Sequence, residues 1–385
     1  MSCVLTPDFY FHSKIMILIT VIAFIVIFSL LILVHEFGHF TAARQAGIHV
    51  EEFGLGLPPK AKVLGKDKHG TEYTLNWIPF GGFVRLFGED SVDPKVLKDH
   101  RSFASKTIWK RVTVIVAGVL MNFVLAWLLI TIGFSVGMKP FLATQDDIDR
   151  AVSSGVVETK KVFFVHEVDP TMPLAKTELK KGDSVTSVNG IPVSESLVLD
   201  QVIVPDAINT LAYLHQGKEL ALQVPANSNR KLGMTISLEN FILKVNEVRY
   251  PIYKAPIMAA MEVGRLSALT VKMLGQVVVT LVTKLAVPAG VAGPVGIAKM
   301  THTFAQQGFM ALLQFTAMLS ISLGVINIMP FPALDGGRLI FILFEIGLRR
   351  RMNAKWETIA HTTGYVLLMV LILAITWNDI WNLIH

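Results

Sequence analysis

Two histidines and a glutamate lie within five residues of each other, in the sequence His35-Glu36-Phe37-Gly38-His39. On a helix, positions i and i+4 share one face, so the imidazoles of His35 and His39 can bind the same metal ion. The chain has one cysteine, which excludes a site built from a cysteine cluster. Two imidazoles beside a carboxylate are typical of catalytic zinc sites, in which Glu36 would act as general base toward a water molecule. The motif therefore predicts one Zn²⁺ per chain and hydrolytic chemistry.

The elements that must position this motif are apolar. Of the 385 residues, 52% are hydrophobic and 17% charged, and the mean hydropathy is +0.54, which excludes intrinsic disorder and favours a membrane protein. A helix needs about 20 apolar residues to cross a bilayer. Such helices are predicted at residues 15–43 and 112–138 in a first membrane half (1–138), and at 308–334 and 358–380 in a second (301–385). Charges interrupt residues 255–300, which predicts amphipathic helices on the membrane surface.

Basic residues predict the orientation of these helices. They gather between residues 44 and 111 and between residues 338 and 355, and the positive-inside rule assigns both segments to the cytoplasm. The net charge of +6 is then explained without a nucleic-acid partner. Both termini and the polar region 139–254 are predicted to be extracytoplasmic. At a rise of about 1.5 Å per residue, His35 lies about 13 Å inward of Arg44, so the active site is predicted inside the bilayer toward the cytoplasm.

Asp335 is predicted to be the third metal ligand, because catalytic zinc needs three protein ligands and one open position. It lies near the end of the third predicted span, on the same membrane side as the His pair, in the segment Asn327-Ile-Met-Pro-Phe-Pro-Ala-Leu-Asp-Gly-Gly337. Prolines interrupt helical hydrogen bonding, and irregular backbone at membrane depth is tolerated where it is buried or lines a wet cavity. Two alternatives stay open: a simple helix-ending turn at Asp335, or a third ligand from the loop residues His49, Glu51 and Glu52.

Residues 161–243 of the outer region alternate in short strands separated by turn signals, which predicts a small β-rich domain. With turns at Gly182-Asp183 and Asn189-Gly190, this stretch resembles a PDZ domain. The resemblance implies a helix over residues 198–214 beside a peptide groove, and strands at 220–224 and 234–238. Such a domain binds a peptide or a substrate ectodomain by adding a strand to a sheet edge. The alternative is a steric cap that binds nothing.

Taken together, these motifs resemble the site-2 protease family of intramembrane zinc metalloproteases. The resemblance covers nearly the whole chain, including the segment Thr71-Glu-Tyr-Thr-Leu-Asn-Trp-Ile-Pro-Phe-Gly-Gly-Phe-Val-Arg85. It implies an α-helical polytopic protein of a bacterial inner membrane, with four transmembrane helices, a cytoplasmic-side membrane-re-entrant β-hairpin at about 71–87 and one extracytoplasmic PDZ-like domain. The implied activity is cleavage of transmembrane segments of single-span membrane proteins, such as anti-sigma factors or remnant signal peptides.

The predicted hairpin supplies candidate substrate-binding residues. A helical substrate hides its carbonyls in internal hydrogen bonds, so it must unwind, and residues 73–85 can offer a strand edge to the extended segment. The residues predicted to contact substrate there are Tyr73, Leu75, Gly81 and Gly82. Asn327 is predicted to bind a substrate backbone group, a role that the family resemblance also suggests. An interhelical hydrogen bond is the alternative for Asn327.

Two departures from the family pattern limit what the resemblance implies. Some relatives carry two tandem PDZ domains, whereas the about 116 residues at 139–254 leave room for one. Val119 follows Gly118 where the family often has proline. A catalytically silent membrane adaptor that recruits partners through its PDZ-like domain is the alternative function, and Glu36 argues against it because a structural metal site needs no base. A transporter is disfavoured because the spans show no internal repeat.

Overall fold

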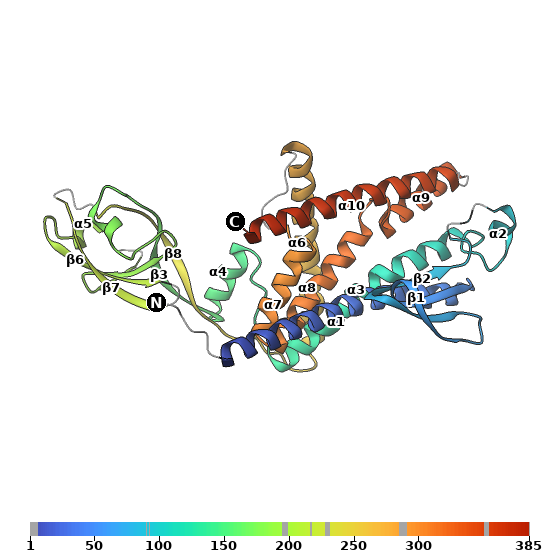
Figure 1. Cartoon of the computed structure of the whole chain (residues 1–385), viewed down its shortest axis with the longest axis horizontal. Helices are drawn as coiled ribbons and strands as arrows, with labels where there is room; N and C mark the ends of the chain where they lie inside the picture. The colour runs from blue at the N-terminus through green and yellow to red at the C-terminus, as the bar shows by residue number, and fades with distance from the viewer. Residues whose placement is uncertain are drawn as a thin grey trace. The chain divides into compact units, whose positions relative to one another are not determined.

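The computed structural model describes residues 7–89, 91, 93–194, 199–215, 218–227, 232–284, 291–349 and 354–384. The chain divides into two compact units: a helical unit, Met1–Met138 with Arg249–His385, and a sheet unit, Lys139–Val248 (Figure 1). The outer region predicted at 139–254 thus begins at the first residue of the sheet unit and extends six residues past its last. Each unit is treated below by itself.

The helical unit has four helices long and apolar enough to cross a membrane among the described residues: α1 (Pro7–Gln45), α3 (Ile108–Val136), α8 (Phe309–Ile328) and α10 (Ala354–Ile384). This confirms the prediction of four apolar helices. The helix α3 packs against both α1 and α8, and the three lie together in Figure 1. The Ser320 hydroxyl of α8 donates to the carbonyl of Asn122 in α3 at 2.7 Å, which links these two helices by a polar contact.

The prediction that Asp335 closes the third span is wrong. The helix α8 ends at Ile328, and Asp335 is instead the first residue of a separate helix, α9 (Asp335–Leu348). The segment 329–334 contains two prolines, which stop the helical hydrogen-bond pattern. This turn folds back onto the start of α9, because a Cβ at Gly336 would lie 2.1 Å from the Met329 carbonyl oxygen. Much of the predicted basic link 338–355 is therefore helical, while residues 350–353 lie outside the described residues.

Between α1 and α3 the chain forms two long strands, β1 (Val50–Lys66) and β2 (Glu72–Leu86), followed by the short helix α2 (Pro94–Lys98). Both strands bend, so that one segment has two neighbours: Phe53 pairs with Val84 and also with Tyr73. On the far side of Tyr73 lies Gly65. Segment 72–75 is therefore internal, with backbone neighbours on both sides, whereas segment 82–86 lies at the edge of the sheet.

Two further helices, α6 (Ala255–Lys284) and α7 (Pro294–Gln306), complete the helical unit in the predicted amphipathic region. The beginning of α6 is tied to α3, because the indole N–H of Trp127 donates to the Pro256 carbonyl at 2.9 Å. Farther along, α6 exposes the apolar side chains of Val271 and Val279. Over the residues that the structure describes, neither helix combines the length and the hydropathy expected of a span.

One carboxylate connects α10 to α7, and its removal is expected to lower stability. Oδ2 of the buried Asp379 accepts hydrogen bonds from Gly293 N–H at 2.9 Å and Gly296 N–H at 2.8 Å, at the start of α7. Asp379→Ala leaves both donors unpaired and is expected to lower the free energy of unfolding by about 1–3 kcal/mol. Asp379→Asn keeps an acceptor oxygen and serves as the matched variant. Denaturant unfolding in detergent measures both, and an Ala variant as stable as the wild type would contradict the assignment.

The sheet unit contains a short helix, α4 (Gln145–Ser153), and one six-stranded antiparallel sheet. The strands are ordered β7-β6-β4-β3-β8, with β5 beside β4. Their core includes Val165, Val185 and Leu211, which are all completely buried. The bounds are β3 (Val157–Val168), β4 (Ser184–Val188), β5 (Ile191–Pro192), β6 (Ile208–His215), β7 (Lys218–Pro225) and β8 (Met234–Val245), with the 3-10 turn η1 (Pro173–Lys176) after β3.

The predicted helix over residues 198–214 is wrong. The structure has only α5 (Leu199–Val202), and β6 begins at Ile208, while residues 195–198 lie outside the described residues. Leu211 and Tyr213 are buried at a period of two, as a strand requires, and Pro205 separates them from the helical turn. The strands predicted at 220–224 and 234–238 do occur, within β7 and β8.

Candidate metal centre and active site

Three electron-pair donors from two distant parts of the chain meet beside α3. His35 Nε2 lies 3.1 Å from His39 Nε2 and 3.1 Å from Asp335 Oδ2, and His39 Nε2 lies 3.3 Å from the same oxygen. The histidines come from successive turns of α1, and the aspartate comes from the first turn of α9. A tetrahedral zinc ion with bonds of about 2.0–2.1 Å spaces its ligands about 3.3 Å apart. The three atoms therefore approximate one face of a zinc tetrahedron.

The outer nitrogen of each imidazole supports this assignment. His39 Nδ1 lies 2.9 Å from the carbonyl oxygen of Val114, an acceptor, so Nδ1 carries the proton and Nε2 presents a lone pair. His35 Nδ1 lies 3.2 Å from the side-chain amide of Asn122. The Asn122 Oδ1 atom has no hydrogen-bond partner in the described part of the chain, and exchanging the amide ends would let it accept from Nδ1–H. Both Nε2 lone pairs then point at the carboxylate, an arrangement that a cation stabilises.

Asp335 fits the role of a metal ligand. Its Oδ2 is buried and has no hydrogen-bond donor among the described residues. As the first residue of α9, it also lies at the positive end of a helix dipole, which favours the ionised carboxylate. Two neutral imidazoles and one carboxylate are a donor set that zinc takes in catalytic sites. His49, Glu51 and Glu52 are not part of the cluster of potential metal ligands formed by described residues.

Glu36 is held beside the three converging donor atoms by the sheet. The backbone N–H of Val84, in the edge segment of β2, donates to Glu36 Oε2 at 3.0 Å. Because Glu36 follows His35 directly on α1, its carboxylate lies near the cluster without being one of the three converging donors. This contact also shows that the edge segment 82–86 lies against α1 beside the site.

Gly118 of α3 packs directly against the imidazole of His39, so a methyl group at this position is expected to displace the ring. A Cβ at Gly118 would lie 2.3 Å from His39 Nε2. We expect Gly118→Ala to weaken zinc binding and to lower the turnover number about 10–100-fold, the range seen when the surroundings of a metal ligand are changed. Gly275→Ala in α6, where a Cβ meets nothing within 4 Å, is the matched control. Metal analysis and peptidase assays test both variants, and normal zinc content in the Gly118→Ala protein would contradict this role.

The predicted substrate residues occupy different places around the sheet. Gly82 lies in the edge segment and packs so closely on α1 that a Cβ would be 2.6 Å from Leu33 Cδ2. Gly81 has a φ of +70° and packs against Ile32. Tyr73 and Leu75 lie in the internal segment, so their backbone is not at a free edge.

Tyr73 and Asn327 differ in what surrounds their side chains. The Tyr73 ring packs against Phe40 and Phe53, with centroids 6.3 and 6.2 Å away, which indicates a packing role. Asn327 lies in the last turn of α8 and is partly exposed. Its amide makes no hydrogen bond to another described residue, so an interhelical bond is not observed and the amide is available to a ligand.

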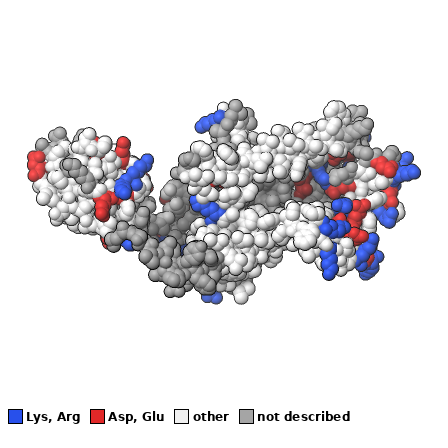
Figure 2. All heavy atoms as spheres, viewed as in Figure 1, with Lys and Arg blue, Asp and Glu red and all other residues white. Residues whose placement is uncertain are grey.

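Charged side chains gather away from the apolar helices. Figure 2 shows Lys, Arg, Asp and Glu concentrated at the end of the helical unit that carries β1, β2 and α2, while the surface over the helices is mostly without charge. Exposed apolar side chains on the helices include those of Ile22, Val26, Leu120 and Leu373. An uncharged apolar belt of this kind is what a bilayer stabilises. Two of the three converging donors, His35 and His39, thus lie on α1, a helix apolar enough to cross a membrane.

Comparison with known proteins agrees with this site. The family model of peptidase family M50 matches residues 23–371. A Clostridium perfringens protein whose name describes a zinc metalloprotease is 34% identical over 365 residues, covering 92% of this chain and 96% of its own. Zinc metalloprotease RasP of Bacillus licheniformis is 30% identical, and the regulator of sigma-W protease RasP of Bacillus subtilis 28% identical, each covering 94% of this chain and 99% of the relative. The chain therefore belongs to peptidase family M50, the site-2 protease family of membrane zinc metalloproteases.

Proposed function

We propose that this zinc protease hydrolyses peptide bonds within the transmembrane segments of single-span membrane proteins, with His35, His39 and Asp335 as the zinc ligands. The observation that carries the proposal is the convergence of these three donors at 3.1–3.3 Å, two of them on α1, a helix apolar enough to lie in a bilayer. Ionisable side chains are costly to place at that depth in a bilayer, so their presence there indicates a functional site.

Glu36 is proposed as the general base. When bound, zinc supplies a water of lowered pKa and polarises the scissile carbonyl. The Glu36 carboxylate takes the proton from the attacking water and returns it to the amine that leaves. The Val84 N–H holds one carboxylate oxygen of Glu36, which leaves the other free for proton transfer. The same side chain thus acts first as base and then as acid.

The edge segment 82–86 is proposed to receive the unwound substrate. A substrate strand added there would exchange its helical hydrogen bonds for bonds to backbone groups of this edge other than the Val84 N–H, which donates to Glu36. Among the predicted residues, Gly82 is supported directly by this geometry, and Gly81 shapes the turn before it. Tyr73 and Leu75 would act through packing of the sheet. Asn327, whose amide is available, is proposed to bind a carbonyl of the extended substrate.

We propose that the sheet β1–β2 enters the membrane as a re-entrant hairpin. The Ser29 hydroxyl of α1 donates to the Pro79 carbonyl at 3.2 Å, and the rings of Phe24 and Phe80 lie 6.1 Å apart. Ser29 precedes Arg44 by fifteen residues, which is about 22 Å along a helix. If Arg44 marks the interface, the turn at Pro79 reaches deeper than the metal-binding cluster. Exposed apolar side chains nearby, Trp77 and Ile78, suit that environment.

The sidedness follows the distribution of basic residues and is also part of the proposal. The charged end of the helical unit is assigned to the cytoplasm of a bacterial inner membrane, and both termini and the sheet unit to the outside. The sheet unit is proposed to be a PDZ-like domain that screens substrate ectodomains, because its antiparallel sheet and its turns at Gly182 and Asn189 suit that fold. Its partners would be substrates already trimmed outside the membrane, such as anti-sigma factors, or remnant signal peptides.

A proteoliposome assay tests the proposed function. The full chain with zinc is reconstituted with a single-span reporter, and the products are mapped by mass spectrometry. We expect cleavage within or beside the reporter's apolar segment and none in a reporter whose segment is a rigid poly-Leu helix. Cleavage confined to extramembrane loops would contradict intramembrane proteolysis. A zinc-loaded protein that cleaves nothing but binds the reporter ectodomain would favour the adaptor alternative.

A further inference from the structure

The turn that carries Asp335 has an unfavourable backbone. The Leu334 N–H donates to the Phe331 carbonyl at 3.1 Å, which closes a four-residue turn with Pro332 second and Ala333 third. Ala333 has a φ of +79°. Proline in the second position and a positive φ in the third are the pattern of a type II turn, where glycine is the usual third residue. An alanine there needs contacts from outside the turn to hold it.

The helix α10 supplies these contacts. The Nδ1 atom of His361 accepts a hydrogen bond from the Ala333 N–H at 3.1 Å. One turn later Gly364 lies against the same turn, since a Cβ there would be 2.5 Å from the Pro332 carbonyl oxygen. Both contacts meet the two central residues of the turn. Ala333, the second of these two residues, precedes the proposed metal ligand Asp335 by two positions.

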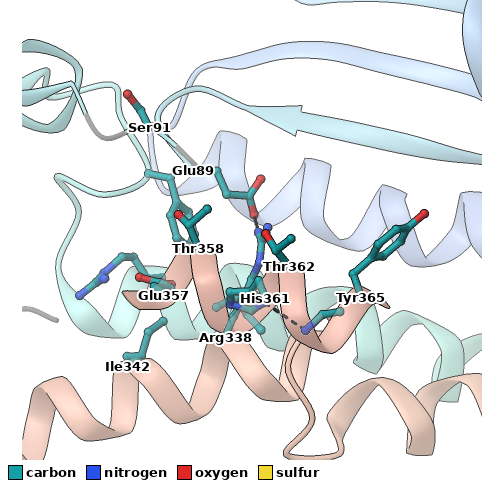
Figure 3. Close-up of a pocket in the computed structure, with 13 residues that line it drawn as sticks. Glu89, Ser91, Arg338, Ile342, Glu357, Thr358, His361, Thr362 and Tyr365 are labelled. Atoms are coloured by element: carbon teal, nitrogen blue, oxygen red, sulfur yellow. Dashed lines mark hydrogen bonds and ion pairs between the residues drawn. The ribbon is translucent and has the colours of Figure 1, made fainter. Parts of the chain in front are cut away.

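His361 borders a pocket of about 380 Å³ lined by residues of α3, α9, α10 and the segment after β2. Figure 3 shows His361 together with Arg338 of α9 and Glu89, which form an ion pair. The Phe341 ring of α9 lies 5.4 Å from the imidazole and limits its movement. Because Nδ1 accepts from the backbone, the imidazole proton is on Nε2, which has no partner in the described part of the chain. The ring is thus fixed by Ala333 and Phe341.

General packing of α10 does not account for these contacts. Only 6% of the residues in its most apolar window are buried among the described residues, so little of this stretch is enclosed by the rest of the helical unit. His361 and Gly364 both contact the turn at Pro332 and Ala333, which directly precedes Asp335.

We propose that His361 is a positioning residue for the metal centre: its hydrogen bond to Ala333 holds the strained turn so that Asp335 meets His35 and His39. The inference rests on the zinc ligands proposed above. Removing the acceptor lets the turn relax toward a negative φ, which moves the carboxylate away from the imidazoles. Zinc affinity and turnover then fall together, while substrate binding at the sheet edge is unchanged.

The test compares His361→Phe with His361→Asn in the full chain. Phenylalanine keeps a ring of similar size and removes the acceptor, whereas the Asn Oδ1 occupies the place of Nδ1 and can accept from the Ala333 N–H. Thr363→Ala, an exposed neighbour on α10, is the control. Zinc Kd is measured by competition with a chelator, and the visible spectrum of the Co²⁺-loaded protein reports the ligand geometry. Turnover number and KM are measured with a single-span reporter.

We expect the Phe variant to bind zinc about 10–100-fold more weakly, as when an outer partner of a metal site is lost, with altered Co²⁺ bands and an unchanged KM. His361→Asn and the control should bind zinc as the wild type does. Ala333→Gly combined with His361→Phe should recover part of the affinity, because glycine adopts a positive φ freely. A Phe variant with wild-type Kd and spectrum, or an Asn variant as defective as Phe, would overturn the role of His361. A wild-type protein without zinc at His35 and His39 would instead overturn the metal centre itself.

Discussion

Replacement of Glu36 by glutamine is expected to lower the turnover number about 10²–10⁴-fold, the usual contribution of a general base, while one zinc per chain is retained. Glutamine has nearly the same shape and its oxygen can still accept from the Val84 N–H, so the local structure is preserved. It cannot take a proton from water at neutral pH. The loss should therefore appear in the chemical step and leave KM nearly unchanged.

Reporter cleavage and metal analysis on the same preparation test this prediction. Glu247→Gln, an exposed acid of the sheet unit, is the matched control and should cleave normally. A Glu36→Gln protein that cleaves as fast as the wild type would show that another group accepts the proton. A variant that has lost its zinc would show that Glu36 holds the metal rather than acting on water.

Replacement of Asp335 by alanine is expected to remove zinc and activity together. The His pair alone leaves two of the three proposed ligands, so the loss of affinity should exceed the roughly 10–100-fold that loss of an outer partner causes. Because His35 Nε2 and His39 Nε2 lie 3.1 Å apart with no proton between them, they should separate or take up a proton when the metal is lost. Activity should not return at moderate zinc concentrations.

Metal content after dialysis against a chelator checks this second prediction. Asp146→Ala, at an exposed position of α4, is the control for loss of an acidic side chain. An Asp335→Ala protein with a full zinc complement would mean that the third ligand is elsewhere. The Glu36 and Asp335 variants together separate the two functions, since only the second should lose zinc.

Much of the architecture was predictable from local patterns. The apolar stretches were long and uncharged, so the four helices could be located from composition and length, and His35, Glu36 and His39 from their helical spacing. The strands β7 and β8 contain the segments 220–224 and 234–238 that the resemblance to a PDZ domain implied. The helix predicted over residues 198–214 failed because its apolar residues suit either period in a short window, and Pro205 and the burial of Leu211 and Tyr213 decide for a strand.

The contacts that complete the site could not be read from the sequence. Val84, Gly118 and His361 reach it through tertiary packing, and each lies in a different element. The sequence shows Asn122 as a single amide in an apolar span, but it does not show that its partner is His35 on α1. The break between α8 and α9 was signalled by Pro330 and Pro332, but local sequence could not show that Asp335 begins the next helix rather than ending the previous one.

The most direct test of the metal centre is an anomalous difference map at the zinc absorption edge, from crystals of the wild-type protein. We expect one peak per chain, about 2.0–2.2 Å from Nε2 of His35, Nε2 of His39 and a carboxylate oxygen of Asp335. A peak at another set of residues, or one bound by the two histidines with the Asp335 carboxylate beyond bonding distance, would contradict it.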